Sequence, residues 1–127
     1  MPNQIIVAGA VISGSALLVA QRARPPELDG RWELPGGKVM AGESEPEALA
    51  RELAEELGIH VVVGERLGHD IDLDDTATLR AYRVELIRGQ PHPRDHRALR
   101  WVTAVELDQV DWVPADRAWL AALSEIL

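Results

Sequence analysis

A chain of 127 residues is long enough to bury one hydrophobic core without disulfides or a structural metal, so the sequence predicts a single domain over residues 1–127. The chain has no cysteine, which excludes a disulfide scaffold. The formal charge is −8, and residues 43–56 carry six glutamates against one arginine. This balance argues against a nucleic-acid polymer as partner, because polyanion binding needs a basic surface. A small phosphorylated molecule that arrives with metal ions is compatible with it.

The chain is uncharged over residues 5–20. Two buried strands, roughly residues 4–12 and 15–21, explain this stretch better than a membrane helix or a signal peptide. The stretch is short for a membrane span, the turn residues 13–15 interrupt it, and the leader before it lacks positive charge. We therefore expect a cytoplasmic protein without a membrane partner.

Two consecutive prolines predict a surface loop after the second strand. Arg22, at the start of this loop, can present a guanidinium that binds phosphate oxygens in a bidentate way; the alternative is a solvated loop arginine. Residues 32–35 predict a short strand that leads into Gly36 and Gly37. These two glycines can take positive φ, and they let a ligand or metal approach the backbone where a Cβ would obstruct it.

The next stretch predicts an amphipathic helix that begins near Glu43, Ser44 and Pro46 and ends at Gly58. At about 100° per residue, one stripe of this helix is apolar and should face the core. The residues of that stripe are Leu49, Ala50, Leu53, Ala54 and Leu57. The adjoining face holds three glutamates: Glu52, Glu55 and Glu56.

Three carboxylates on one helix face repel one another, so a compensating charge is expected. Clustered oxygen ligands suit hard divalent cations, Mg²⁺ or Mn²⁺, better than zinc. Arg51 is the expected internal counter-charge, in a pair with Glu43 from the preceding loop. The alternative is a solvated acidic helix face.

This stretch resembles the signature sequence of the Nudix hydrolases, the Nudix box, without a departure. The nine matching positions are Gly37, Glu43, Arg51, Glu52, Leu53, Glu55, Glu56, Gly58 and Ile59. The resemblance implies divalent-metal-dependent hydrolysis of a nucleoside diphosphate linked to another group. It implies as metal ligands Glu52, Glu55, Glu56 and the carbonyl of Gly36. Arg51 and Glu43 would be the pair that orients them.

Beyond the helix the chain predicts strands in residues 61–63, 67–73, 77–87 and 98–102, with a hairpin turn at residues 74–76. Residues 115–127 predict a closing amphipathic helix after Pro114. Strands with two helices on the faces of a mixed sheet form an α/β/α sandwich, and the resemblance implies the same architecture.

A further base that activates water is usual but not required, and a box glutamate is also open as the base. Asp95 and His96 are the candidates, because several relatives place an acidic residue that reaches the metal cluster in the loop just before the strand at residues 98–102. Counting back from Trp101, Asp95 matches that position better, so it is predicted both as a catalytic residue and as a metal ligand. The alternatives are a turn residue for Asp95 and a surface imidazole for His96.

The segment of residues 111–117 resembles the base-recognition stretch of the MutT-like subgroup, where Pro-Ala precedes an asparagine in the 8-oxoguanine-sanitising type. Asp116 departs from that type and matches members that resemble CTP pyrophosphohydrolases. Its alternative role is a cap or first-turn acid on the last helix. The predicted substrate-binding residues are Arg22, Leu34, Lys38 and Asp116.

The resemblance implies a Mg²⁺-dependent nucleoside triphosphate pyrophosphohydrolase acting on CTP or dCTP, including 5-methyl forms, and on 8-oxo-dGTP. One alternative is a hydrolase of ADP-ribose or dinucleotide polyphosphates. Another, of a different class, is a non-catalytic nucleotide-binding regulatory module. The expected partner is a small nucleoside triphosphate, and the oligomeric state stays open.

Overall fold

The computed structural model describes residues 3–127, so the first two residues of the predicted domain lie outside the described residues. The strands are β1 (Gln4–Ser13), β2 (Ala16–Gln21), β3 (Trp32–Glu33), β4 (Gly36–Lys38), β5 (His60–Asp72), β6 (Ala77–Arg88) and β7 (Ala98–Val102). The helices are α1 (Glu45–Leu57), the 3₁₀ helices η1 (Ala104–Gln109) and η2 (Ala115–Trp119), and α2 (Leu120–Ile126).

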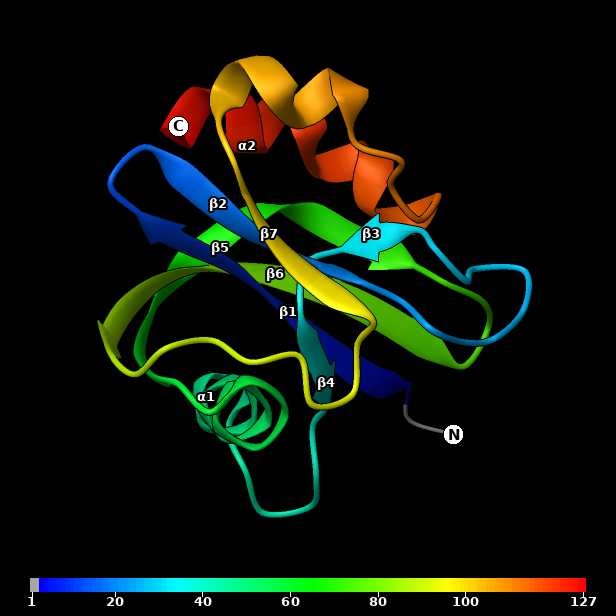
Figure 1. Ribbon diagram of the computed structural model, residues 1–127. Coiled ribbons are helices and arrows are strands. Elements are labelled where there is room, and N and C mark those ends of the chain that lie inside the picture. Colours follow the sequence, from blue (N-terminus) through cyan, green and yellow to red (C-terminus); the bar gives the residue numbers. More distant parts are fainter. Residues whose placement is uncertain (1–2) are drawn as a thin grey trace.

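A mixed sheet forms the middle layer, as the sequence predicts. Its order is β3-β2-β1-β6-β5, with β4 added to β1 and β7 to β2. Strands β1 and β6 are parallel, and the other strand pairs are antiparallel. Helix α1 covers one face of the sheet, and η1, η2 and α2 cover the other (Figure 1). The α/β/α arrangement is therefore confirmed.

Helix α1 begins and ends where the sequence predicts. Ser44 is its N-cap and forms a reciprocal capping box with Glu47. Gly58 ends the helix at φ +71°, a left-handed conformation that glycine adopts without steric cost. Leu49, Leu53 and Leu57 are fully buried against the sheet, and β4 lies beside the helix (Figure 1).

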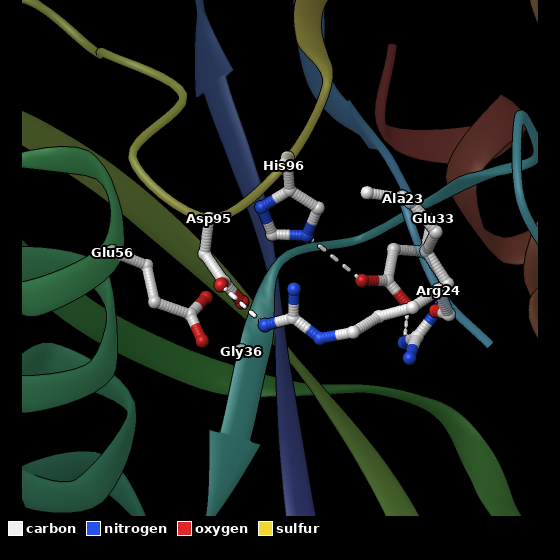
Figure 2. Close-up of a pocket in the computed structure, with 8 residues that line it drawn as sticks. Ala23, Arg24, Glu33, Gly36, Glu56, Asp95 and His96 are labelled. Atoms are coloured by element: carbon white, nitrogen blue, oxygen red, sulfur yellow. Dashed lines mark hydrogen bonds and ion pairs between the residues drawn. The ribbon is translucent and has the colours of Figure 1, made fainter.

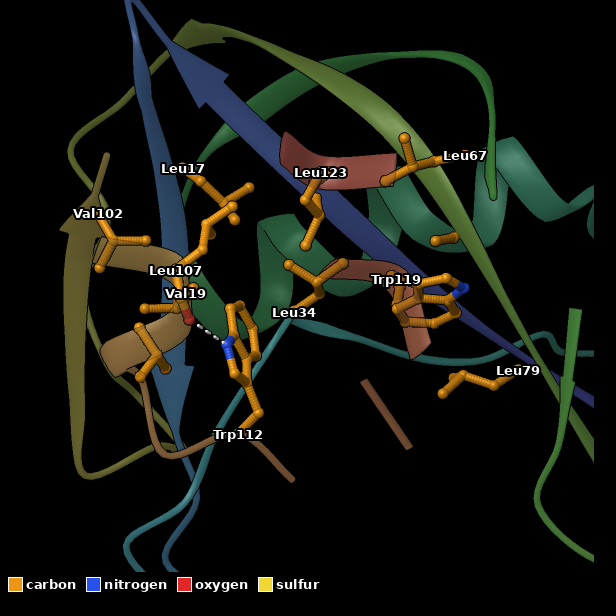
Figure 3. Close-up of a cluster of buried hydrophobic side chains, with 14 residues drawn as sticks. Leu17, Val19, Leu34, Leu67, Leu79, Val102, Leu107, Trp112, Trp119 and Leu123 are labelled. Atoms are coloured by element: carbon orange, nitrogen blue, oxygen red, sulfur yellow. Dashed lines mark hydrogen bonds between the residues drawn. The ribbon is translucent and has the colours of Figure 1, made fainter. Parts of the chain in front are cut away.

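The opposite face of the sheet packs against the C-terminal layer (Figure 3). The single helix predicted for residues 115–127 is wrong, because the chain forms a 3₁₀ turn up to Trp119 and an α-helix only afterwards. Side chains three residues apart eclipse in a 3₁₀ helix, so Asp116 and Trp119 both point into the interior, where they are buried. The Trp119 indole donates to the carbonyl of His69 at 3.0 Å.

Strand β5 is continuous, whereas the sequence predicts two separate runs at residues 61–63 and 67–73. The strand keeps its pairing with β6 through register shifts on either side of Arg66 and Leu67. Gly68 has φ +65°, which accommodates one of these irregularities. The turn predicted at residues 74–76 is present, with the Leu73 amide donating to the carbonyl of Ala77.

One edge of β1 is divided between two strands, and this division positions the polar site. Its C-terminal end pairs with β2 at Ile12 and Ser13, while β4 pairs with residues 6–8. The amide of Gly9 donates to the carbonyl of Pro35 between the two pairings, so the segment from β3 to β4 crosses from β2 to β1 at this point.

Gly36 and Gly37 lie in the extended strand β4, so neither uses the positive φ that glycine permits. Their missing Cβ atoms make room for other parts of the chain. A Cβ on Gly36 would overlap the carbonyl oxygen of Val7, and one on Gly37 would overlap the carboxylate of Glu52. These glycines are needed for the proximity of β4 to β1 and to α1.

None of the helices within residues 3–127 is long and apolar enough to cross a membrane.

Gly36→Ala should lower the free energy of unfolding by at least about 3 kcal/mol, because the added methyl meets backbone that cannot move without breaking the β1–β4 pairing. Gly14→Ala is the control, since its Cβ would meet open space and adds only positive-φ strain of about 1 kcal/mol. Urea denaturation measures both. Equal losses in the two variants would contradict the packing argument.

Candidate active site

The polar face of α1 lies beside β4 and the loop that precedes β7. Glu52 and Glu56 are turned toward the sheet, and Glu52 contacts the backbone at Gly37. Glu55 is turned outward, with 60% of its side chain exposed. The three glutamates of the predicted acidic face therefore have different environments.

Arg51 compensates most of this charge, and its predicted pair with Glu43 is confirmed. Its Nε and Nη2 donate to the two carboxylate oxygens of Glu43 at 2.6 and 3.0 Å, a bidentate pair that lowers the pKa of Glu43. Nη1 donates to Glu52 at 2.9 Å and to Glu55 at 3.1 Å. Nη2 also donates to the carbonyl of Lys38, which ties α1 to β4.

Glu56 lies beyond the reach of this arginine. Its Oε2 is buried and has no hydrogen-bond partner among the described residues. Burial raises the pKa of Glu56 to about 8, and the nearby carboxylates of Glu52, Asp95 and Glu33 add to the shift. Without a cation, Glu56 therefore keeps a proton at neutral pH.

A cavity of about 170 Å³ opens next to Glu56. It is lined by Arg22, Ala23, Arg24, Glu33, Gly36, Glu56, Asp95 and His96. Figure 2 shows Asp95 and Glu56 facing one another, with the side chain of Arg24 extending toward Asp95. The structure thus brings Asp95 to the box helix, as the sequence predicts.

The loop that carries Asp95 is fixed to the end of α1. The amide of Arg94 donates to the carbonyl of Glu56 at 3.3 Å. The Arg94 guanidinium donates to the carbonyls of Ala54 and Glu55 at 3.4 and 3.2 Å. The last carbonyls of a helix lack partners within it, so a cation there is favourable, and Arg94 sets the position of its neighbour Asp95.

His96 is not the surface imidazole considered as an alternative. Only 8% of its side chain is exposed, and its Nε2 lies 2.9 Å from Glu33 Oε2. Glu33 also accepts a hydrogen bond from Arg22 Nη1 at 2.9 Å. Glu33 is not among the predicted site residues, although it stands in the segment that leads into the glycine pair.

The residues around Glu56 fit a hard divalent cation. A buried carboxylate oxygen without a partner is costly unless a proton or a cation compensates it, and every acid that faces it offers oxygen alone. Glu52 and Glu56 would hold such an ion, with Asp95 opposite them and Gly36 on the cavity wall. Glu55 is engaged by Arg51, and no three acidic or histidine side chains within residues 3–127 converge as a preformed metal site.

The predicted substrate-binding residues line a second cavity, and Arg22 lines both cavities. Asp116 is buried, and its Oδ2 accepts the amide of Leu34 at 2.8 Å. It lies in the first turn of η2, as one alternative predicts, but it is not the cap, and its carboxylate is bound by a different segment of the chain. Arg22 and Lys38 line the same cavity, of about 280 Å³, as Leu34 and Asp116.

The comparisons with known proteins agree with this geometry. Residues 3–123 match the NUDIX domain family. A protein of Mycobacterium tuberculosis named "Putative 8-oxo-dGTP diphosphatase 2" is 67% identical, covering 100% of this chain and 92% of its own. The CTP pyrophosphohydrolase of Escherichia coli is 37% identical over 92% of this chain and 88% of its own. A solved structure from work on MutT from Aliivibrio salmonicida and Vibrio cholerae has a TM-score of 0.77 at 30% identity, over 96% of each chain.

The fold, the box helix and these matches define a hydrolase that acts on acid anhydrides of phosphorus. The chain belongs to the Nudix family, and it is similar to MutT-like members of that family. Nudix hydrolases generally use divalent metals such as Mg²⁺.

Glu56→Gln tests the buried carboxylate in a buffer with EDTA. The folded protein holds the Glu56 proton up to about pH 8, whereas the unfolded chain releases it near 4.5, so wild-type stability falls as pH rises between these values. The variant lacks this fall and should be more stable at pH 8 by roughly 1–2 kcal/mol, a value reduced for solvent screening. Near pH 4.5 the two proteins should be alike.

The same variant should lose hydrolysis by about 10²-fold or more, because one anionic ligand of the cation is removed. Near-normal turnover with Mg²⁺ would contradict the role of Glu56. Denaturant unfolding at several pH values and initial rates provide the two measurements.

Proposed function

We propose that the protein is a Mg²⁺-dependent nucleoside triphosphate pyrophosphohydrolase that releases nucleoside monophosphate and pyrophosphate. Its proposed substrates are CTP and dCTP, including 5-methyl forms, and 8-oxo-dGTP, and its proposed role is sanitation of the cytoplasmic nucleotide pool. The names of the 67%- and 37%-identical relatives support these two kinds of base.

The position of Asp116 is the observation that carries this proposal. An apolar cavity of about 340 Å³ shares Ile6, Arg22, Leu79 and Asp116 with the cavity beside β4. A base bound in the apolar part would meet the Asp116 carboxylate, while its phosphates would extend past Arg22 toward Glu56. The geometry therefore suits a nucleotide with a polar base edge and a polyphosphate.

The chemistry of Asp116 suits two bases. One oxygen accepts the Leu34 amide, and burial raises the pKa of Asp116 to about 7, so its ionised and protonated forms are both populated near neutral pH. The ionised form accepts a hydrogen bond from the N4 amino group of cytosine. The protonated form offers a donor and an acceptor, which match the O6 and N7–H of 8-oxoguanine. Uracil presents an acceptor at O4, which the ionised form cannot bind, so uracil should be a poorer substrate base than cytosine where Asp116 is ionised.

The remaining residues act on the phosphates and the water. Arg22 binds phosphate oxygens through its guanidinium, which neutralises charge that develops during the reaction. Arg51 holds Glu43 and Glu52 in position. Asp95, which faces Glu56, is the proposed base that accepts a proton from the attacking water. A bound Mg²⁺ would polarise the phosphate and lower the pKa of the water.

Product analysis in ¹⁸O-water tests the reaction. Attack at the β-phosphorus should place the label in pyrophosphate and leave the monophosphate unlabelled. Mass spectrometry of the two products reads this result. Label in the monophosphate would instead indicate attack at the α-phosphorus, and orthophosphate as the first product would reject the scheme.

Asp116→Asn tests base selection. It should weaken the preference for CTP over UTP by roughly 1–3 kcal/mol, the cost of a mismatched polar partner in a buried site, and should relatively favour 8-oxo-dGTP. In the wild type, the ratio of kcat/KM for CTP to that for 8-oxo-dGTP should rise with pH across pH 7. This rise should be absent from the variant, because the amide does not titrate.

Asp111→Asn is the matched control, since Asp111 lies in the same segment but pairs at the surface with Arg31 at 3.8 Å. Unchanged substrate ratios in Asp116→Asn would show that Asp116 is structural only. A higher kcat/KM for ADP-ribose or a dinucleotide polyphosphate than for any nucleoside triphosphate would favour the alternative hydrolase.

A further inference from the structure

Two arginines line the cavity beside Glu56, and the proposed reaction uses only one of them. Arg22 binds Glu33, and its Nε also donates to the carbonyl of Arg24 at 2.9 Å. This bond fixes the backbone of the short segment that carries both arginines. Arg24 therefore has a defined starting point from which its side chain extends along the cavity (Figure 2).

The guanidinium of Arg24 is held by one acid. Its Nη2 donates to Asp95 Oδ1 at 2.6 Å, and this is its only side-chain partner within residues 3–127. The Arg24 side chain is 69% exposed and that of Asp95 53% exposed. Exposed ion pairs contribute little to stability, so a stronger anion or cation can replace either partner.

Other groups at the site would compete for Asp95 and so weaken its pair with Arg24. Asp95 faces Glu56, which has a buried oxygen without a partner among the described residues. A cation beside Glu56 would attract Asp95, and a polyphosphate would attract Arg24. Both exchanges break the same ion pair, so each favours the other.

We propose that Arg24 is a second phosphate-binding residue, and that Asp95 occupies its guanidinium while no nucleotide is bound. This inference rests on the proposed function, because it assumes that the cavity takes a polyphosphate. Guanidinium groups bind phosphate in a bidentate way, and a polyphosphate carries more negative charge than one carboxylate. Substrate binding then transfers Arg24 from Asp95 to the phosphates and frees Asp95 for its role at Glu56.

A neighbouring ion pair provides a matched control. Arg97 binds Asp29 through two hydrogen bonds of 2.6 and 2.9 Å, and it joins the same two loops as the pair of Arg24 and Asp95. Neither residue lines the cavity. A purely structural role for Arg24 would therefore be reproduced by a change at Arg97.

The test is calorimetric titration of inorganic tripolyphosphate into the protein with EDTA at pH 7.5. Arg24→Gln should weaken binding by about tenfold, as expected for the loss of one charge-assisted phosphate contact. Arg97→Gln should stay within about twofold of the wild type. Asp95→Asn should bind about two- to fivefold more tightly, because it frees Arg24. This gain should disappear in the double variant with Arg24→Gln.

Three outcomes would overturn the proposal. Equal affinity for tripolyphosphate in Arg24→Gln and wild type would show that Arg24 does not contact the phosphates. Equal weakening in Arg24→Gln and Arg97→Gln would show that both ion pairs only hold the two loops together. If Asp95→Asn still increases the affinity in the double variant with Arg24→Gln, the increase is a general effect of removing one negative charge. Melting temperatures check that each variant is folded. Tripolyphosphate has no base and undergoes no reaction in EDTA, so these results do not depend on which nucleotide the enzyme hydrolyses.

Discussion

Repulsion between carboxylates that face one cavity is the constraint on which the site depends. Glu33, Glu52, Glu56 and Asp95 approach one another from a strand segment, a helix and a loop. Arg51 pairs with Glu52 and with the neighbouring Glu43, which lowers the repulsion on that side. Glu33 pairs with Arg22, and Asp95 pairs with Arg24. Glu56 alone stays without a cationic partner. Within this cluster, the buried oxygen of Glu56 is therefore the one that lacks a partner among the described residues, and a divalent ion bound there would stabilise it most.

The strand pairing of the sheet brings these carboxylates together. Because β1 pairs with β2 at one end and with β4 at the other, the segment between β3 and β4 has to cross from β2 to β1. That crossing places Glu33 and Gly36 on the wall of the acidic cavity, while the amide of Leu34 is presented to Asp116. Gly37 lets α1 approach until Glu52 touches the backbone. One short segment therefore serves both the phosphate end and the base end of the proposed substrate path.

Local patterns in the sequence were sufficient to predict helix α1, the pair of Arg51 and Glu43, and most of the strands. The sequence of this stretch predicts α1, its start near Ser44 and its end at Gly58, because end signals and periodicity act over a few residues. The pair of Arg51 and Glu43 follows from one helix turn and one loop. The alternating and apolar runs likewise predict most strands, since burial on a sheet face has a short period.

Features set by distant contacts could not be read in the same way. The extended conformation of Gly36 depends on Val7, and the 3₁₀ turn at Asp116 depends on burial of that residue and Trp119. Glu55 lies on the predicted acidic face, but in the structure it is exposed and bound by Arg51. No sequence pattern indicates a role for Arg24, because its partner Asp95 is 71 residues away in the chain. Such side chains are placed by tertiary packing rather than by sequence spacing.

The 3₁₀ turn that buries Asp116 also separates two tasks along the polypeptide. In the proposed function, hydrolysis relies on residues of α1 and its neighbouring loops, whereas the base would be met by a C-terminal turn whose Asp116 accepts the amide of Leu34. Substitutions in that turn would then alter which base is accepted while the hydrolytic groups keep their positions. On this proposal, base preference and hydrolysis are set by separate parts of the fold, so one can change without the other.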